Sequence, residues 1–447
     1  MTVLAHGLGG RSDLPVPLWM ALYGGGAAVV VSFVALGALW VTPRLSGATA
    51  GRPLPARLQF IVQARRTRVA LRTLSLAGLV ATVTVGVLGT PSSATNPAPT
   101  WLYVWFWVGL VPASLLFGPV WRALNPLRGI SALLDRVIQD PSETAVRALP
   151  ERLGHWPAVA SLAVFLWIEL VSTRPDSPAV VVVFCVGYTL VHVGAGLVYG
   201  RRWFAHGDGF EVYSTLLGHL APVGRRADGR IVLRNPLDGL AALRVDASRM
   251  AVVCLLLGST AFDGLSRTSW WEEVSARFIQ SPPLYILLGT AGLAGAVGLV
   301  VLTFVLGARL AATLGAGTRL GDDGRSLPCR FAHSLVPIAT GYTVAHYFSL
   351  LVFEGQKGYI LASDPLGTGA NLFGTANWAI DYQAVSLSTI AWVQVLAIVV
   401  GHVVGVVVTH DRAVGLFAPG DRTRAQYPLL AVMVFYTCAG IGLLLGA

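Results

Sequence analysis

HSLVPIATGYTVAHYFSLLVFEGQ, residues 333–356, is the stretch of sequence that decides the fold. It exceeds the ~20 mostly apolar residues that an α-helix needs to cross the ~30 Å hydrocarbon layer of a membrane. It nevertheless contains His333 and His346, and it ends beside Glu354. A charged side chain in a membrane span costs on the order of 2.5–3.5 kcal/mol, so ionisable groups there face the protein interior and have partners. The stretch therefore predicts a helix enclosed by other membrane-spanning helices.

The composition extends this prediction to the whole chain. Of the 447 residues, 54% are hydrophobic and 12% are charged, whereas a soluble domain has about 25% charged residues. We predict an all-α fold: a polytopic transmembrane helix bundle of about ten spans, forming a single integral membrane domain over residues 1–447. The spans are expected at 17–42, 70–92, 101–120, 156–172, 179–200, 245–265, 283–308, 330–353, 386–408 and 427–446.

The distribution of positive charge predicts the orientation. Lys and Arg collect in the cytoplasmic segments of membrane proteins. With the N-terminus outside, 27 of the 32 Lys and Arg residues fall in inner segments, so both termini are predicted to lie outside. This pattern accounts for the net charge of +10 without nucleic acid, and the lipid bilayer is the expected partner.

Two inner segments share a phrase. NPLRGISALL (125–134) and NPLDGLAALR (235–244) both begin Asn-Pro-Leu and continue with a short helix-forming run. Asn is favoured at a helix N-cap and Pro at the first helical position, where its missing N–H costs nothing. We expect each phrase to open a short helix on the inner membrane surface, with Asn125 and Asn235 as caps rather than catalytic groups.

The segment FEVYSTLLGHL (210–220) has apolar residues at helical spacing, and it predicts another interfacial helix. Four ionisable residues lie in or just before it: His206, Asp208, Glu211 and His219. A metal site is one interpretation of this group. A solvated surface is the favoured interpretation, because nothing in the sequence forces these groups out of water.

Ionisable and polar residues within or at the ends of the predicted spans fall at two depths. The inner set, which fits a pathway, is His192, His333, His402 and His410. For His410, which is followed by Asp411 and Arg412, a hydrated helix end with an ion pair is an equally good interpretation. The outer set, which we expect to form a site near the outer surface, is His346, Asp263, Glu354, Glu169 and Gln394.

Paired haem is not favoured for these histidines. His192 and His206 are fourteen residues apart, which leaves their side chains about 40° apart around a helix. However, His206 follows two arginines and is expected outside the membrane. His333 and His346 are thirteen residues apart, or about 140°, so they cannot easily face one partner.

The outer set predicts a metal centre. One imidazole and several carboxylates from different helices form a hard or borderline metal site. We expect His346, Asp263 and Glu354 to hold a divalent metal ion such as zinc, with Asp263, Glu354 and Glu169 as the catalytic carboxylates. The metal would deliver hydroxide to an electrophile. The loop 354–385 could form a lid over this site.

Several other residues have simpler interpretations. Hydrated positions are favoured for three carboxylates of the outer loops, Glu272, Glu273 and Asp364. All four cysteines lie in or next to spans without metal-ligand spacing, and core thiols are expected at Cys185, Cys254, Cys329 and Cys438. The N-terminal MTVLAHGLGG fits either the end of a signal peptide or a short exported tail.

Four stretches carry a resemblance to a known family: AHGLGGRSDLPVP (5–17), AFDGLSRTSWW (261–271), HSLVPIATGYTVAHYFSLLVFEGQ (333–356) and VQVLAIVVGHVVGVVVTHDRA (393–413). The chain resembles actinobacterial membrane proteins labelled fenitrothion hydrolase. The resemblance implies a protein of the bacterial plasma membrane that hydrolyses a phosphotriester. It assigns no role to individual residues. Members of this family commonly carry a longer, signal-like segment before the Ala-His-Gly that contains His6 in this chain.

Three functional hypotheses follow. The first is an outward-facing, metal-assisted hydrolase of small apolar esters or phosphoesters. The second is a transporter or metal-handling permease, in which the outer and inner sets form two ends of one ion path. Ten spans, 50 glycines and polar groups within helices suit this second hypothesis. The third is a structural or assembly subunit.

Overall fold

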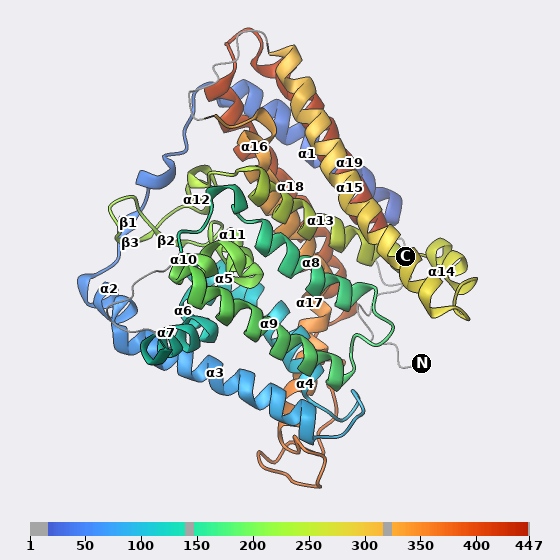
Figure 1. Ribbon diagram of the computed structural model, residues 1–447. Coiled ribbons are helices and arrows are strands. Elements are labelled where there is room, and N and C mark those ends of the chain that lie inside the picture. Colours follow the sequence, from blue (N-terminus) through green and yellow to red (C-terminus); the bar gives the residue numbers. More distant parts are fainter. Residues whose placement is uncertain (1–16, 139–146, 316–323, 446–447) are drawn as a thin grey trace. The chain divides into compact units, whose positions relative to one another are not determined.

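The computed structural model describes residues 17–138, 147–315 and 324–445, and it is almost entirely helical (Figure 1). Within these ranges, ten helices are long and apolar enough to cross a membrane. The predicted helical bundle of a multi-pass membrane protein is therefore confirmed. His6 lies outside the described residues.

The spans follow the predicted order with shifted ends. They are Leu18–Leu39, Arg65–Leu88, Ala98–Phe117, Glu151–Leu170, Pro178–Tyr199, Ala247–Ser266, Pro282–Leu314, Leu327–Ala362, Leu387–Leu416 and Arg422–Leu444. The largest difference concerns the eighth span, predicted to end at residue 353. Its helix continues to Ala362, so the first part of the predicted loop 354–385 is helical.

The chain forms two compact units. Unit 1 comprises Met1–Ala50, Asn235–Leu350 and Gln383–Ala447, as far as these are described. Its elements are α1 (Leu18–Leu39), η2 (Gly47–Thr49), α12 (Pro236–Ala242), α13 (Ala247–Ser266), α14 (Ser269–Ala276), α15 (Pro282–Leu314), α16 (Leu327–Phe331), η5 (Ala332–Ser334), the first part of α17 (Leu335–Ala362), α18 (Leu387–Leu416) and α19 (Arg422–Leu445).

Unit 2 comprises Gly51–Arg234 and Leu351–Tyr382, again as far as described. Its elements are β1 (Arg52–Pro53), α2 (Ala56–Gln63), α3 (Arg65–Leu88), α4 (Ala98–Thr100), η3 (Trp101–Val108), α5 (Leu110–Phe117), α6 (Val120–Leu124), α7 (Pro126–Ile138), η4 (Glu151–Leu153), α8 (Trp156–Leu170), α9 (Pro178–Tyr199), α10 (Arg201–Gly207), α11 (Gly209–Gly218), β2 (Val223–Arg225), β3 (Ile231–Leu233) and the end of α17.

Burial separates the interior helices of unit 1 from its outer ones. Helices α1, α15, α18 and α19 run side by side (Figure 1). We compare the share of buried residues in the most apolar stretch of 18 residues of each span. This share is 72% for α13 and 78% for the span that contains α17, but 17% for α1 and 28% for α15. Since α13 and α17 are shielded from lipid, these are the helices that can carry ionisable groups.

Glycines allow α17 and α18 to approach closely. A Cβ added to Gly341 of α17 would lie 2.3 Å from the carbonyl oxygen of Ala397. A Cβ added to Gly401 of α18 would lie 2.6 Å from the carbonyl oxygen of Pro337. These neighbours are backbone atoms, which cannot move aside as a side chain can. Small residues at such contacts are the usual means by which membrane helices pack tightly.

Aromatic side chains surround α11 in the core of unit 2. Phe210 lies 4.8 Å from Phe106 and 5.2 Å from Phe165, measured between ring centroids. Tyr213 stacks on Trp107 at 4.7 Å. The predicted helix over 210–220 is present as α11, and it packs against these rings instead of lying open at a surface. Because these aromatic rings pack around it, α11 is buried over most of its length.

A small antiparallel sheet of order β1-β3-β2 completes unit 2. Arg52 pairs with Leu233, and Val223 pairs with the same residue on its other side. The turn between β2 and β3 contains Gly229 with a φ of 83°, a conformation that glycine adopts without strain. The sheet thus joins two Arg-rich segments, since β1 lies between the first two spans and β2 and β3 lie between the fifth and sixth.

We predict that Gly341→Ala destabilises the protein and Gly355→Ala does not. The added methyl group at 341 meets backbone, and overpacking of this kind costs about 1–3 kcal/mol. Gly355 lies on the same helix with nothing within 4 Å of an added Cβ, and alanine is favoured over glycine in a helix by about 1 kcal/mol. Thermal unfolding in detergent, followed by tryptophan fluorescence, measures both. An equal change in the two variants would contradict the assigned contact.

Candidate functional site

An Asp–His pair lies in the interior of unit 1. His346 Nε2 of α17 is 2.5 Å from Asp263 Oδ2 of α13. Each residue is 4% exposed. The two residues are 83 positions apart in the sequence, so the packing of α13 against α17 brings them together. The sequence analysis places both residues in the outer set, as ligands of one metal ion; here they contact each other directly.

Arg267 completes the charge balance of this pair. It lies one helical turn after Asp263, a spacing at which side chains share a helix face. Its Nη2 and Nε donate to Asp263 Oδ1 over 2.8 Å and 3.2 Å. The carboxylate is therefore held between a guanidinium and an imidazole. With Arg267 balancing the carboxylate, the charge of this group depends on whether His346 is protonated.

Three polar atoms of α17 next to the pair have no hydrogen-bond partner among the described residues. They are Tyr342 Oη, His346 Nδ1 and Ser349 Oγ. Their spacing of four and three residues places them along one helix face. Tyr342 Oη lies 2.7 Å from the position of a Cβ added to Gly264, the residue after Asp263. An unpaired buried polar group costs about 1–3 kcal/mol, so this face is suited to a ligand or water.

The other residues of the predicted metal centre are placed differently. Glu354 and Glu169 belong to unit 2, and both are partly buried there. In unit 1, His346 Nε2 and Asp263 Oδ2 are in direct hydrogen-bond contact, so there is no room for a metal ion between these two atoms. In the described ranges no group of three His, Cys, Asp or Glu side chains is placed to hold a metal. The zinc centre thus stays a prediction.

The four histidines of the predicted inner pathway divide between the units. His333, His402 and His410 are buried in unit 1. His402 Nδ1 lies 2.8 Å from the carbonyl oxygen of Ile398. His333 Nε2 lies 3.4 Å from that of Val408. These contacts leave one ring nitrogen of His333 and one of His402 without a partner in the described residues.

His410 is held by protein groups on both sides of its ring. Its Nδ1 lies 2.9 Å from Gln426 Oε1, and its Nε2 lies 3.0 Å from the carbonyl oxygen of Trp40. The neighbouring Asp411 accepts from Arg44 N over 2.7 Å and from Trp40 Nε1 over 3.0 Å. Both residues are less than 9% exposed, so this helix segment is buried rather than hydrated.

His192 belongs to unit 2 and is also engaged. Its Nδ1 accepts a 3.0 Å hydrogen bond from Trp203 Nε1. Helix α9 ends at Tyr199, and Gly200 follows with a φ of 65°. His206 therefore lies on the separate helix α10, and the two histidines do not share the single helix that a paired-haem arrangement needs.

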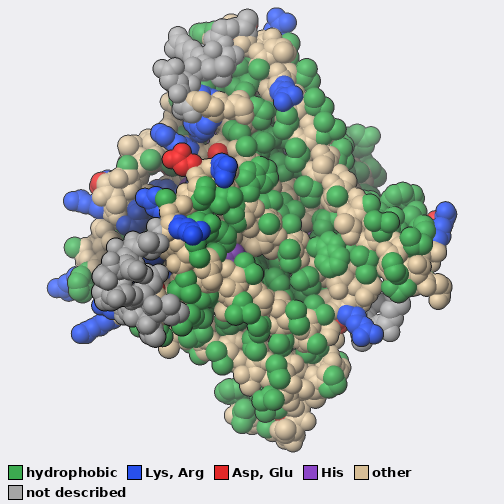
Figure 2. Space-filling model, viewed as in Figure 1, with side chains coloured by type: hydrophobic (Ala, Val, Ile, Leu, Met, Phe, Trp, Pro, Cys, Tyr) green, Lys and Arg blue, Asp and Glu red, His purple; other side chains and the backbone are tan. Residues whose placement is uncertain are grey.

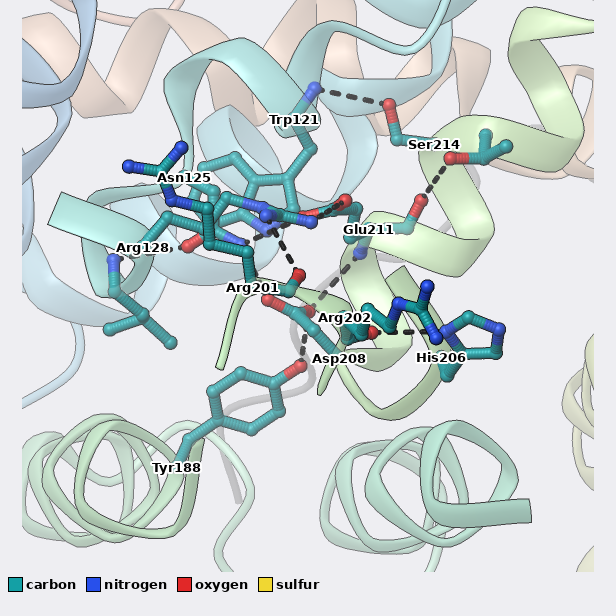
Figure 3. Close-up of polar contacts among 12 residues, drawn as sticks. Trp121, Asn125, Arg128, Tyr188, Arg201, Arg202, His206, Asp208, Glu211 and Ser214 are labelled. Atoms are coloured by element: carbon teal, nitrogen blue, oxygen red, sulfur yellow. Dashed lines mark hydrogen bonds and ion pairs between the residues drawn. The ribbon is translucent and has the colours of Figure 1, made fainter. Parts of the chain in front are cut away.

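A second set of buried polar groups lies in unit 2 (Figure 3). We call Asn125, Arg128, Tyr188, Asp208 and Glu211 the buried carboxylate network. Asp208 and Glu211 are 0% and 1% exposed. The favoured interpretation of these two carboxylates as a solvated surface is therefore wrong. His206 and His219, from the same predicted group, are partly exposed.

The network satisfies its carboxylates from several helices. Arg128 donates to both oxygens of Glu211, over 2.7 Å and 2.5 Å. Asp208 accepts from Tyr188 Oη and from Asn125 Nδ2, each over 2.7 Å. Asp208 also caps α11, since its side chain accepts from Glu211 N. The spacing Asp-Gly-Phe-Glu at 208–211 is that of a capping box, and this signal could have located the helix start.

Asn125 and Asn235 cap their helices as predicted. Asn125 Oδ1 accepts from Leu127 N, and Asn235 Oδ1 from Leu237 N, both over 3.0 Å. The two differ in surroundings. Asn125 is 0% exposed and also donates to the network, whereas Asn235 is exposed.

Comparison with known proteins adds no assignment to these sites. Scans of the chain against protein-family models, curated proteins and solved structures found no match. The resemblance to proteins labelled fenitrothion hydrolase stays a prediction. The chemistry must therefore be argued from the geometry itself.

We predict that Asn125→Ala destabilises the protein more than Asn235→Ala. Both changes remove a cap worth about 1 kcal/mol. Asn125→Ala also leaves two buried carboxylates short of a donor, which adds about 1–3 kcal/mol. Thermal unfolding of the two variants in the same detergent measures the difference. Equal losses would show that the network contributes nothing beyond the cap.

We predict a pH dependence of stability from Asp208. Burial raises the pKa of Asp208 above its ordinary value of 3.8, despite its hydrogen bonds. Because its folded pKa lies above its unfolded one, its contribution is complete at the acidic end and is lost as the pH rises through the folded pKa. The stability of the natural protein relative to Asp208→Asn should therefore fall as the pH increases from about 4.

Asp228→Asn is the control for this measurement. Asp228 is exposed, and the hydrogen bond from Arg226 lowers the pKa of Asp228 to about 2. Its protonation therefore changes only below about pH 4. Unfolding curves between pH 4 and 8 should therefore give a difference for Asp228→Asn that does not fall as the pH rises. If the difference for Asp208→Asn does not fall anywhere in this range either, the pKa of Asp208 is not raised.

Proposed function

We propose that this protein is a proton-coupled membrane transporter in which the Asp263–His346 pair takes up and releases a proton. The observation that carries this proposal is the position of unsatisfied polar atoms in unit 1. Every buried side-chain nitrogen or oxygen of unit 1 that has no hydrogen-bond partner in the described residues lies on η5, α17 or α18. They are His333 Nδ1, Tyr342 Oη, His346 Nδ1, Ser349 Oγ, His402 Nε2 and Thr409 Oγ1.

These atoms extend over most of a membrane's thickness. His333 and Ser349 are sixteen residues apart, which corresponds to about 24 Å along a helix. The hydrocarbon layer is ~30 Å thick. A set of polar atoms of this extent favours a path for a proton or a small solute, because water or substrate can satisfy groups that the protein leaves unpaired.

The chemistry of the pair suits proton exchange. Histidine is the side chain whose charge ordinarily changes near neutral pH. His346 can gain a proton while Nε2 remains hydrogen-bonded to Asp263, because its Nδ1 has no other partner in the described residues. In the predicted orientation His346 would exchange protons toward the outside and His333 toward the inside.

A second candidate function is ester hydrolysis, and one observation favours it. Ser349 lies three residues after His346, and both Ser349 Oγ and His346 Nδ1 lack partners in the described residues. A hydroxyl, an imidazole and a carboxylate in series form the serine hydrolase triad, in which the base activates the nucleophile. This candidate agrees with the hydrolysis implied by the resemblance, and it gives the nucleophile role to Ser349 rather than to a metal-bound hydroxide.

We predict that His346→Gln abolishes proton-coupled transport. Glutamine can keep a hydrogen bond to Asp263 but cannot carry a proton. Liposomes containing the purified protein and a pH-sensitive dye report proton movement when candidate solutes are added outside. Glu273→Gln is a matched control, because Glu273 is an exposed carboxylate of α14 in the same unit. Undiminished solute-driven proton flux in His346→Gln would rule out the assigned role.

Ser349→Ala separates the two candidate functions. Loss of the nucleophile should remove ester hydrolysis, whereas proton flux should be reduced but not abolished, because Ser349 is one of six polar groups of the path and does not itself take up the proton. Hydrolysis of an aryl phosphotriester by the same protein, lost in both Ser349→Ala and His346→Gln, would favour the hydrolase. Solute-driven flux that survives in Ser349→Ala and is absent in His346→Gln would favour the transporter.

A further inference from the structure

Unit 2 contains a group of arginines with too few carboxylates to balance them. Arg72 of α3 interacts electrostatically with three other guanidinium groups, those of Arg68, Arg128 and Arg201. Among the described residues, the carboxylate whose charge opposes these three on Arg72 is that of Glu211. Glu211 is already bonded by Arg128 through both of its oxygens. Positive charge is therefore in excess at this place.

Arg72 is also unsatisfied as a hydrogen-bond donor. Its Nε is buried and has no partner in the described part of the chain. Arg68 and Arg201 likewise have no carboxylate partner among the described residues, and both side chains are exposed. A buried donor without a partner normally indicates a missing acceptor. The acceptor that suits several guanidinium groups is an anion.

The surrounding packing holds these arginines in place. The Cδ of Arg72 lies 3.8 Å from the position of a Cβ added to Gly129, so α3 and α7 are in close contact there. Arg128 Nη1 donates to the carbonyl oxygen of Arg201 over 3.1 Å, and Figure 3 shows Arg128 and Arg201 next to each other. Arg128 thus joins the start of α10 to α7, the helix that packs against α3.

The neighbouring helix favours a lipid as the source of the anion. Helix α2, directly before α3, exposes Phe60 at 76% and Ile61 at 54%. Exposed arginines lie at 57, 65 and 66 of the same segment. Blue side chains gather in Figure 2 along the edge where Figure 1 places α2. Apolar and basic groups side by side are typical of a helix that lies in the headgroup layer.

We propose that Arg68, Arg72 and Arg201 bind the phosphate group of an anionic phospholipid. The guanidinium groups would donate hydrogen bonds to the phosphate oxygens, and Arg72 Nε would gain its missing acceptor. Inorganic phosphate offers the same chemistry, so an experiment must distinguish the two sources. The proposal is independent of the transport function of unit 1.

The test is lipid binding by the purified protein in a non-ionic detergent, measured by native mass spectrometry. Phosphatidylglycerol, phosphatidylcholine and inorganic phosphate are titrated separately. We expect phosphatidylglycerol to bind more tightly than phosphatidylcholine. The double variant Arg72→Gln/Arg201→Gln should bind phosphatidylglycerol about 25-fold more weakly, because each arginine near an anionic surface contributes about fivefold.

Matched controls separate the site from overall charge. Arg225→Gln/Arg230→Gln removes the same charge from exposed positions on either side of the β2–β3 turn and should bind as the natural protein does. Should the double variant at 72 and 201 fail to fold, Arg201→Gln alone, at an exposed position, should weaken binding about fivefold. Equal weakening in the control pair, or none at 72 and 201, would overturn the proposal. If inorganic phosphate displaces the lipid, the phosphate chemistry is supported. If inorganic phosphate binds and phosphatidylglycerol does not bind, the lipid assignment is overturned.

Discussion

The cost of an unpaired polar group in an apolar interior is the constraint on which the structure depends. In water such a group is satisfied by solvent, but between membrane helices its partner must come from the protein, a bound ligand or trapped water. Two buried polar clusters, one in each unit, meet this constraint differently. The buried carboxylate network of unit 2 supplies partners to both oxygens of Asp208 and Glu211. In unit 1 both carboxylate oxygens of Asp263 have hydrogen-bond partners, but nearby polar atoms of α17 have none among the described residues.

This difference suggests a division between a rigid element and a reactive one. A fully satisfied polar network is directional, and it fixes the positions of the helices that contribute to it. In unit 2 the network joins α7, α9, α10 and α11. In unit 1 the atoms without partners lie on the interior helix α17 and on its neighbour α18. Groups that must exchange a proton or a ligand cannot be permanently bonded to protein.

Much of the fold could be predicted from the sequence because lipid simplifies the pattern. Length and hydropathy alone predicted ten spans, and ten helices of that kind are present in the described chain. The approach of His346 to Asp263 was also predictable, since both are ionisable residues placed at the same depth. The sequence could not assign residues to units. Glu354 and His346 are eight residues apart on one helix, yet they belong to different units, because that assignment depends on long-range packing.

The segments between spans were harder to predict. Burial of α11 depends on aromatic residues from α8, α9 and η3 that are distant in sequence, so local amphipathicity suggested a surface position. The sheet of unit 2 was missed although Asp228-Gly229 is a common hairpin turn. Hydropathy patterns predict contact with lipid, and the segments between spans have little contact with lipid, so their structure could not be predicted in this way.

The glycines between α17 and α18 have a mechanical consequence. Where Gly341 and Gly401 meet, backbone touches backbone, so this part of the contact has no interlocking ridges and grooves. Such a surface resists separation of the helices but opposes axial sliding only weakly. The longitudinal alignment of the pair must then be set elsewhere, by contacts such as that of the His333 ring with the carbonyl of Val408.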